Sequence, residues 1–258
     1  MNEKDILISH TVDMKEKAAD NSIVTHTKFL SADEISIVMQ TNRHLSSFVD
    51  TFFYGGYSES ERCLCVFVPK FYKCSDIHAF LSQQDINPIS LIRVTKDKFC
   101  ALSHRDYLGS IMGLGIKREM IGDIVTDENG CLIFVLNSIS NFLCENLQRV
   151  GRGSVSCEIV SLDEFKLSDD DVVECFYSVA SLRLDNFLCA VFNISRSLAS
   201  ESIQKGIIFV NSVKATKNDY IIKVKDKVVF RSKGKAVLEQ IKGESKKGRI
   251  HIIVKRYK

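Results

Sequence analysis

The last third of the chain gathers side chains that can bind a polyanion. Cationic and polar residues recur there in an ordered pattern, and the candidates are Arg183, Arg196, Ser197, Lys205, Asn211, Lys214, Arg231, Lys233 and Lys235. A guanidinium donates paired hydrogen bonds to phosphate oxygens, whereas lysine acts as a movable point charge. Because few aromatic residues are interleaved with these charges, we expect contacts with the phosphate backbone rather than stacking on splayed bases.

The charge distribution sets this segment apart. Residues 181–258 contain 18 Lys and Arg against 6 Asp and Glu, a net charge of +12, while residues 1–180 carry −9. Such a split indicates a polyanionic partner for the basic part alone. If about five phosphates are neutralised, log K should fall against log salt with a slope of roughly −3.5.

Two short helices are expected to position these residues. Apolar side chains at one-face helical spacing predict the first helix, and they are Leu184, Phe187, Leu188, Val191 and Phe192. Ser195 can cap a second helix that Gly206 would end. A strand follows over 207–211, and further short strands surround 231–235. We expect the helices to expose Arg183, Arg196, Ser197 and Lys205 from one surface, while loops add Lys214, Arg231, Lys233 and Lys235.

The first segment, 1–85, is predicted to be an N-terminal α/β subdomain. Ser31 and Glu34 have the spacing of a capping box, and the apolar pattern that follows predicts a helix over 32–45. The run 63–68 is apolar on both faces and predicts a buried strand.

Residues 86–162 show the order βαββαβ, which is typical of a ferredoxin-like subdomain. Asn129-Gly130 predicts a two-residue hairpin turn with positive φ at both positions. The strand over 131–136 lies where RNA-recognition domains carry stacking aromatics, yet it offers only Phe134. We therefore expect this subdomain to bind RNA weakly or not at all.

An acidic stretch predicts a linker over 163–180, before a C-terminal domain over 181–258. The predicted fold class is thus α+β. Nine cysteines without a CxxC pattern fit a reducing compartment, and no apolar run is long enough to span a membrane. We expect a cytoplasmic protein with no catalytic residue, no metal site, no cofactor and no small-molecule substrate.

Several candidate residues have structural alternatives that the sequence leaves open. Arg183 and Asp185 can form an ion pair within the domain that orients the helices. Asn211 can close a strand end through its own backbone instead of touching RNA. Lys205 can complement the dipole at the C-terminus of its helix.

The C-terminal segment resembles the S4 (αL-type) RNA-binding domain. The resemblance lies in Arg183-Leu184-Asp185 with Leu188, Ser195-Arg196-Ser197 with Ala199, Lys205-Gly206, Val210-Asn211, and Asp226 before Val228. Two positions depart from the pattern, because Ser212 and Lys225 stand where many members have glycine. We expect these two departures to change how tight the two turns are and to leave the fold unchanged.

The part of the chain before the C-terminal segment carries further motifs. They are Phe52-Phe53-Tyr54-Gly55-Gly56-Tyr57, Glu61-Arg62, His104-Arg105-Asp106-Tyr107-Leu108-Gly109, Gly113-Leu114-Gly115-Ile116-Lys117-Arg118 and Ile121-Gly122-Asp123-Ile124. With these motifs the full chain resembles the YlmH family of bacterial S4-domain proteins. The resemblance implies a ribosome-associated protein that binds structured rRNA and tRNA on the large subunit. It further implies a part in ribosome-associated quality control, at obstructed subunits carrying peptidyl-tRNA, and a link to cell division.

Two other functions compete with this non-catalytic one. S4 domains are often appended to RNA-modifying enzymes, and Arg183-Leu184-Asp185 superficially matches the catalytic motif of pseudouridine synthases. The Thr-x-Gly that should follow is absent, since the chain continues Asn186-Phe187-Leu188. Alternatively, the acidic part docks a protein and RNA only localises this adaptor.

Overall fold

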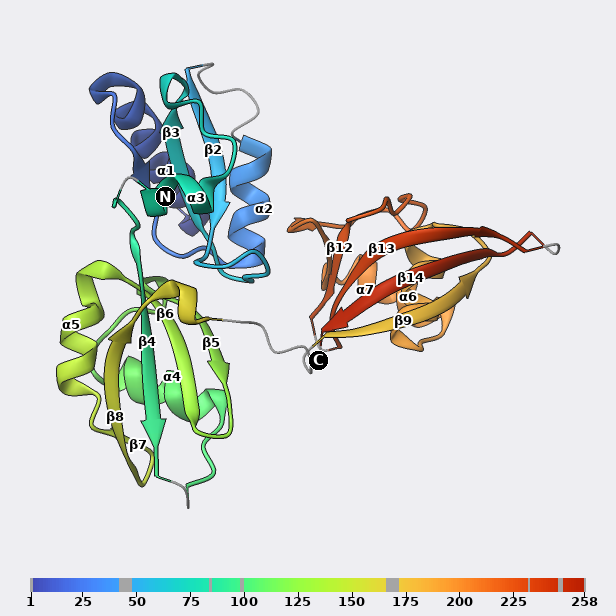
Figure 1. The fold of residues 1–258 in the computed structure, drawn as a ribbon. Coiled ribbons are helices and arrows are strands. Elements are labelled where there is room, and N and C mark those ends of the chain that lie inside the picture. Colours follow the sequence, from blue (N-terminus) through green and yellow to red (C-terminus); the bar gives the residue numbers. More distant parts are fainter. Residues whose placement is uncertain are drawn as a thin grey trace. The chain divides into compact units, whose positions relative to one another are not determined.

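The computed structural model describes residues 2–41, 48–83, 85–97, 100–165, 172–231, 233–245 and 248–257. The chain divides into two compact units, Met1–Lys166 and Leu167–Lys258. Each contains helices and antiparallel sheets, so the predicted α+β class is confirmed. Figure 1 shows both units, and each is described by itself below.

The N-terminal part of the first unit surrounds a three-stranded antiparallel sheet of order β1-β3-β2. Its elements are α1 (Glu3–Asn21), β1 (Thr25–His26), α2 (Ala32–Thr41), β2 (Val49–Tyr54), β3 (Leu64–Pro69), the 3-10 turn η2 (Lys70–Tyr72) and α3 (Ile77–Gln83). Every residue of β3 is buried, as predicted. The predicted capping box is present, because the Ser31 backbone N–H donates to Glu34 at 2.7 Å. Residues 42–45 of the predicted helix lie outside the described residues.

The rest of the first unit has the predicted ferredoxin-like topology. Its elements are β4 (Ile89–Lys96), α4 (His104–Gly113), η3 (Arg118–Met120), β5 (Ile121–Thr126), β6 (Gly130–Leu136), α5 (Asn137–Asn146), β7 (Arg149–Val150), β8 (Gly153–Val160) and η4 (Leu162–Glu164). The sheet order is β5-β6-β4-β8-β7, with β4 between β6 and β8. Helix residues Tyr107, Ile111 and Leu143 pack on one face of this sheet.

The predicted turn at Asn129-Gly130 is wrong by one position. The Asp127 N–H bonds the Gly130 carbonyl at 3.0 Å, so Glu128 and Asn129 are the central residues. Neither has a positive φ, because the Asp127 carboxylate accepts the N–H groups of residues 129 and 130 and closes the turn from the side. Gly130 is needed for a different reason, since a Cβ there would lie 1.9 Å from the Val94 carbonyl oxygen.

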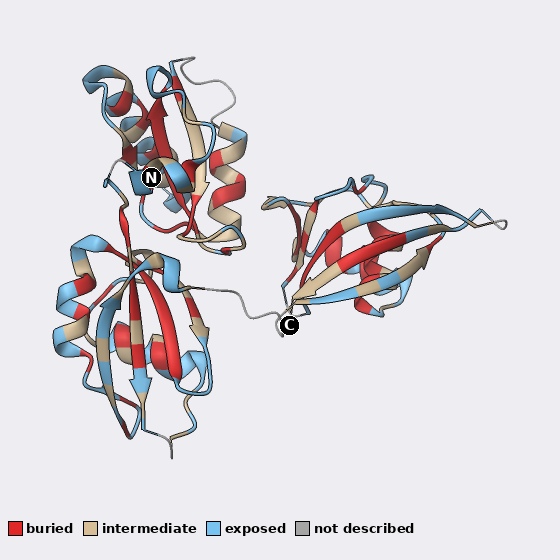
Figure 2. Cartoon of the chain, in the orientation of Figure 1, coloured by how far each residue is buried: buried red, intermediate tan, exposed pale blue. Residues whose placement is uncertain are grey.

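The other face of the ferredoxin-like sheet is the shared core of the first unit. Phe29, Leu64 and Val66 from the N-terminal part pack with Leu91 and Phe134. Phe134 is fully buried, with the Tyr57 ring 5.0 Å away and the Phe165 ring 5.1 Å away. The subdomains expected over 1–85 and 86–162 are therefore joined through a common core. Figure 2 shows the buried stretches of β3, β4 and β6 in red.

Polar groups reinforce this joint, and several belong to the motifs that carry the family resemblance. Asp123 accepts hydrogen bonds from the Tyr57 hydroxyl at 2.8 Å and from the Arg62 N–H at 3.0 Å. Burial, followed by the charge of Asp123, raises the pKa of Tyr57, so the phenol remains a donor. Arg62 and Arg118 both donate to the Ile121 carbonyl. These residues hold the first unit together.

The C-terminal unit is a six-stranded antiparallel sheet covered on one face by two helices (Figure 1). Its elements are β9 (Val172–Val179), α6 (Leu184–Phe192), α7 (Arg196–Gln204), β10 (Ile208–Val210), β11 (Val213–Lys214), β12 (Lys227–Phe230), β13 (Gly234–Glu244) and β14 (Ile250–Tyr257). The strand order is β11-β10-β12-β13-β14-β9. Phe187 and Leu188 of α6 pack against Phe230 and Val254 in its core.

The predicted linker over 163–180 requires a correction. All eight residues of β9 pair with β14, from Val172 opposite Tyr257 to Val179 opposite Ile250. The acidic residues before Val172 led to the prediction of a linker, but β9 is a strand that completes the C-terminal sheet through its backbone hydrogen bonds with β14. The unit therefore begins before the boundary near 180 that the sequence suggested.

Candidate nucleic-acid interface

The start of α6 is tied to a loop that lies far away in the sequence. The Leu184 N–H donates to the Tyr220 carbonyl at 2.7 Å, and the Asp185 N–H donates to the Asn218 carbonyl at 3.1 Å. Free N–H groups at a helix N-terminus need such acceptors. The Asn218 side chain also donates to the Ser200 hydroxyl on α7. Loop 215–221 therefore fixes both helices, and its Lys217 is exposed.

A single carboxylate, Asp185, organises the two leading arginines. Arg183 binds it through both Nε and Nη2, at 3.1 and 3.0 Å. Arg196, the first residue of α7, binds Oδ2 through Nη2 at 3.2 Å. The Asn186 backbone N–H adds a contact at 2.9 Å. The Arg183–Asp185 ion pair that the sequence left open is thus present, and the Arg196–Asp185 ion pair joins the two helices.

Asp185 remains ionised in this setting. The residue is 3% exposed, and burial by itself would raise the pKa of its carboxyl. The hydrogen bonds from Arg183, Arg196 and Asn186 outweigh burial and hold the pKa below its ordinary value. The arginine side chains stay accessible, at 39% for Arg183 and 67% for Arg196. Guanidinium N–H groups that do not face Asp185 can therefore donate to an incoming phosphate.

The remaining helical candidates divide between the two ends of α7. Ser195 caps the helix, because its hydroxyl accepts the Leu198 N–H at 3.2 Å, and Ser197 is exposed beside it. Lys205 lies at the opposite end and pairs with Glu201 at 2.6 Å. Lys205 is nine positions after Arg196, an offset that places the two residues about half a turn apart around the helix axis. The structure brings Arg183 and Arg196 together but does not group Lys205 with them.

Lys205 instead lies next to a second basic cluster at the turn between α7 and β10. Gly206 has a φ of +67°, and a Cβ there would meet the Lys214 side chain at 3.0–3.2 Å. The end of the Lys214 side chain therefore lies next to the Gly206 Cα. The Arg231 N–H donates to the Ile207 carbonyl at 3.0 Å, and its guanidinium lies 4.9 Å from the centre of the Phe209 ring. This turn gathers Lys205, Lys214 and Arg231.

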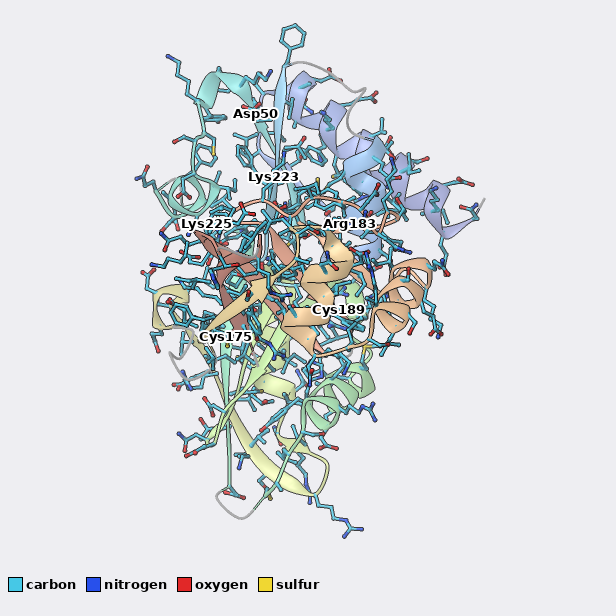
Figure 3. All side chains as sticks on the ribbon, turned by 90° about the vertical axis from the view of Figure 1, so that its right-hand side faces the viewer. Asp50, Cys175, Arg183, Cys189, Lys223 and Lys225 are labelled. Carbon is cyan, nitrogen blue, oxygen red and sulfur yellow. The ribbon has the colours of Figure 1, made fainter. Side chains whose placement is uncertain are left out.

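Asn211 acts within the fold. Its side-chain amide donates to Asp226 at 2.7 Å and accepts the Lys227 N–H at 2.9 Å. Asp226 in turn accepts the Lys223 N–H at 2.9 Å. Figure 3 labels Lys223 and Lys225 on this segment before β12, and Arg183 at the start of α6. Asn211 therefore positions a lysine-bearing turn, and it does so through Asp226 and Lys227 instead of through its own backbone.

Lys233 is exposed, but the expectation for Lys235 is wrong. Lys235 is 7% exposed and lies in β13 instead of a loop. Its ammonium group sits 4.1 Å from the centre of the Tyr257 ring, which covers it. Alternation along the strand turns this side chain onto the sheet, where a tyrosine from β14 stabilises the charge. Lys235 is left out of the candidate interface.

Sequence reasoning missed the contribution of loop 215–221. Asn218 lies more than thirty residues from Asp185 in the chain, and spacing carries no sign of their contact. Within the described residues, no group of three or more His, Cys, Asp or Glu is arranged to hold a metal ion. No helix among them has the length and apolar character to cross a membrane.

Three protein-family models match the chain in succession. Residues 3–80 match the model described as "YlmH, N-terminal", and residues 83–164 match "Putative RNA-binding domain in YlmH". Residues 182–228 match "S4 domain". The two models specific to YlmH together span more than half of the chain.

Two individual proteins are similar to this chain. The "Ribosome-associated protein quality control protein P2" of Bacillus subtilis (strain 168) is 28% identical over 206 residues, covering 80% of this chain and 77% of that protein. The solved structure titled "Cell division protein ylmH from Streptococcus pneumoniae" is 20% identical, with a TM-score of 0.49, and covers 64% of this chain and 94% of that one. From its successive domain matches, the chain belongs to the YlmH family and carries a C-terminal S4 domain.

Proposed function

We propose that this chain is a non-catalytic RNA-binding protein that binds structured rRNA or tRNA on the large ribosomal subunit. Its task would be ribosome-associated quality control, at obstructed subunits that carry peptidyl-tRNA. The name of the Bacillus subtilis relative supports the process. The S4 match and the net charge of +12 over residues 181–258 support RNA as the ligand.

The observation that carries this proposal is the pair of arginines held by Asp185. Both guanidiniums are fixed by one buried carboxylate at 3.0–3.2 Å and still reach solvent. Because their orientation is set before RNA arrives, less side-chain entropy is lost on binding. The proposed interface comprises Arg183, Arg196, Ser197, Lys205, Lys214, Lys217, Arg231 and Lys233.

The environment of Asp185 argues against the pseudouridine synthase alternative. That chemistry needs an aspartate free to attack a base, yet this carboxylate is 3% exposed and accepts hydrogen bonds from two arginines and a backbone N–H. A nucleophile with its lone pairs occupied in this way is poorly placed to react. The motif instead serves to hold the two helices.

Co-sedimentation with large ribosomal subunits tests the proposal. The R183A/R196A variant loses the forked guanidinium groups of both arginines. At about 1.5 kcal/mol for one charge-assisted bond from each, its affinity should fall about a hundredfold or more. R183K/R196K keeps a positive charge near Asp185 without the fork, so it should retain an intermediate affinity.

Two controls define the outcome. The K4A/K17A variant removes the same charge from exposed positions on α1 and should sediment like the unmodified protein. Circular dichroism checks that each variant is folded. Unchanged sedimentation of a folded R183A/R196A protein would reject the interface, and retention on nuclease-treated material would favour the protein adaptor.

A further inference from the structure

A group of exposed aromatic and basic residues lies on the first unit, away from the S4 domain in the sequence. We call it the aromatic patch, and it comprises Phe48, Lys70, Phe71, Tyr72 and Lys73. Phe48 is 75% exposed, Phe71 60% and Tyr72 38%. Both lysines are exposed as well. Large aromatic rings left in water on a folded surface commonly mark a binding site.

Backbone geometry brings these residues together. Strands β2 and β3 pair with Val49 opposite Pro69, so the residues just beyond both strand ends are neighbours. The Lys70 N–H donates to the Phe48 carbonyl at 3.0 Å. The chain then forms η2, and Lys73 ends it with a φ of +52° while its N–H donates to the Lys70 carbonyl. The patch is therefore held by main-chain hydrogen bonds.

The rings form a continuous aromatic surface. The Phe71 and Tyr72 ring centres are 4.2 Å apart and tilted by 32°. Tyr72 also meets Phe80 of α3 edge to face, at 5.4 Å, which anchors it to the fold. Neither the Phe71 ring nor the Tyr72 ring is among the residues of the two buried clusters in this part of the chain. Phe71 and Tyr72 are thus available for a ligand.

The neighbouring charges indicate the ligand. Lys70 and Lys73 flank the two rings in the sequence, which combines stacking surfaces with cations for phosphates. Asp50 and Asp76 are the acidic residues nearest to the patch in the sequence. Asp76 is engaged at the start of α3, where it accepts the His78 and Ala79 N–H groups, and Asp50 lies within β2, where Figure 3 labels it.

We propose that the aromatic patch binds unpaired nucleotides of RNA, with bases stacked on Phe71 and Tyr72 and phosphates held by Lys70 and Lys73. This contact is distinct from the interface proposed for the S4 domain, where the expected contacts are with the phosphate backbone of folded RNA. The first unit would thus add recognition of a single-stranded segment, although its overall charge is negative.

The absence of tryptophan from the sequence allows a direct test. In the full chain, F71W places one tryptophan in the patch, and F176W places one at an equally open position on β9, where Phe176 is 71% exposed. Short single-stranded oligouridylate should quench the fluorescence of F71W in a saturable way, because a stacked base contacts the indole. F176W should show no comparable quenching.

Further variants in the F71W background sharpen the result. Y72A should weaken oligouridylate binding roughly 5- to 150-fold, the range for loss of one stacked base. K70A/K73A should weaken it and flatten its salt dependence. R183A/R196A should leave the quenching unchanged, so failure of the S4 interface and failure of this proposal are distinguished.

The proposal is overturned if oligouridylate leaves F71W fluorescence unchanged or quenches F176W equally. It is also overturned if Y72A, folded by circular dichroism, binds oligouridylate as well as the F71W parent. A response of F71W to RNA-free ribosomal protein instead of oligouridylate would assign the patch to a protein partner and reject the RNA contact.

Discussion

RNA binding could be expected from two regions, the ferredoxin-like sheet and the S4 helices. Their candidate residues differ in accessibility, because the sheet buries its aromatic residue and the helices expose their arginines. Phe134 occupies the strand position of a stacking aromatic but is fully buried beneath Tyr57 and Phe165. Arg183 and Arg196 are held by a buried partner and remain exposed. The same open sheet face that binds RNA in other proteins is used here to join two parts of one unit.

The comparison shows that topology alone does not assign an RNA surface. Farther along the same face of the sheet, Arg93 pairs with Asp127 at 3.5 Å and lies opposite Glu158 on β8. These groups are polar and neutralise one another, so they offer neither a stacking platform nor a net positive charge. What decides the matter is which side chains the rest of the fold leaves accessible.

Replacing Phe134 by alanine tests whether this ring stabilises the core or contacts RNA, and it should have the largest effect. The ring fills the shared core, and its removal should lower the free energy of unfolding of the first unit by about 3–5 kcal/mol. Structured RNA should bind to the folded protein with unchanged affinity. Denaturant unfolding followed by tyrosine fluorescence and RNA titration at low temperature measure the two effects. A selective loss of RNA affinity would show that this face does bind RNA.

The Asp185→Asn variant tests whether this carboxylate stabilises the S4 helices. We expect the free energy of unfolding to fall by about 2 kcal/mol at neutral pH. The folded pKa of Asp185 lies below the ordinary value of about 3.9. Its stabilisation is therefore complete above that value and disappears as the pH falls through the lower, folded pKa.

The difference in unfolding free energy between the unmodified protein and the Asp185→Asn variant should consequently be constant near pH 7 and shrink below about pH 4. Thermal unfolding of the two proteins across this range measures it. A difference that stays the same at strongly acidic pH would contradict the assigned role. RNA binding of the variant should also weaken, because Arg183 and Arg196 lose their common anchor.

The smallest effect concerns the turns that hold the S4 strands. Ser212 has a φ of +65°, a conformation that costs a non-glycine residue about 1 kcal/mol. Ser212→Gly should therefore raise the melting temperature of the C-terminal unit by a few degrees. Asn211, at a φ of +49°, is the matched contrast, because Asn211→Gly loses both amide hydrogen bonds and should destabilise. Equal shifts in both variants would contradict this account.

Local sequence signals determined much of this protein. The helical spacing of Leu184 to Phe192, the cap at Ser195, the left-handed Gly206 and the βαββαβ order all act through neighbouring residues, and all are present in the structure. The two departures from the S4 pattern, Ser212 and Lys225, also adopt the positive φ that glycine usually provides. The turns are kept at the cost of local strain.

Tertiary structure decided which of the candidate residues can contact a ligand. Whether Phe134 stacks on a base or on Tyr57, whether Lys235 meets solvent or Tyr257, and whether Asp185 joins two helices all depend on segments distant in the sequence. Residue type and spacing specify which hydrogen bonds and charges a side chain can offer. Burial by remote strands and loops then determines whether those groups face another part of the protein or a ligand.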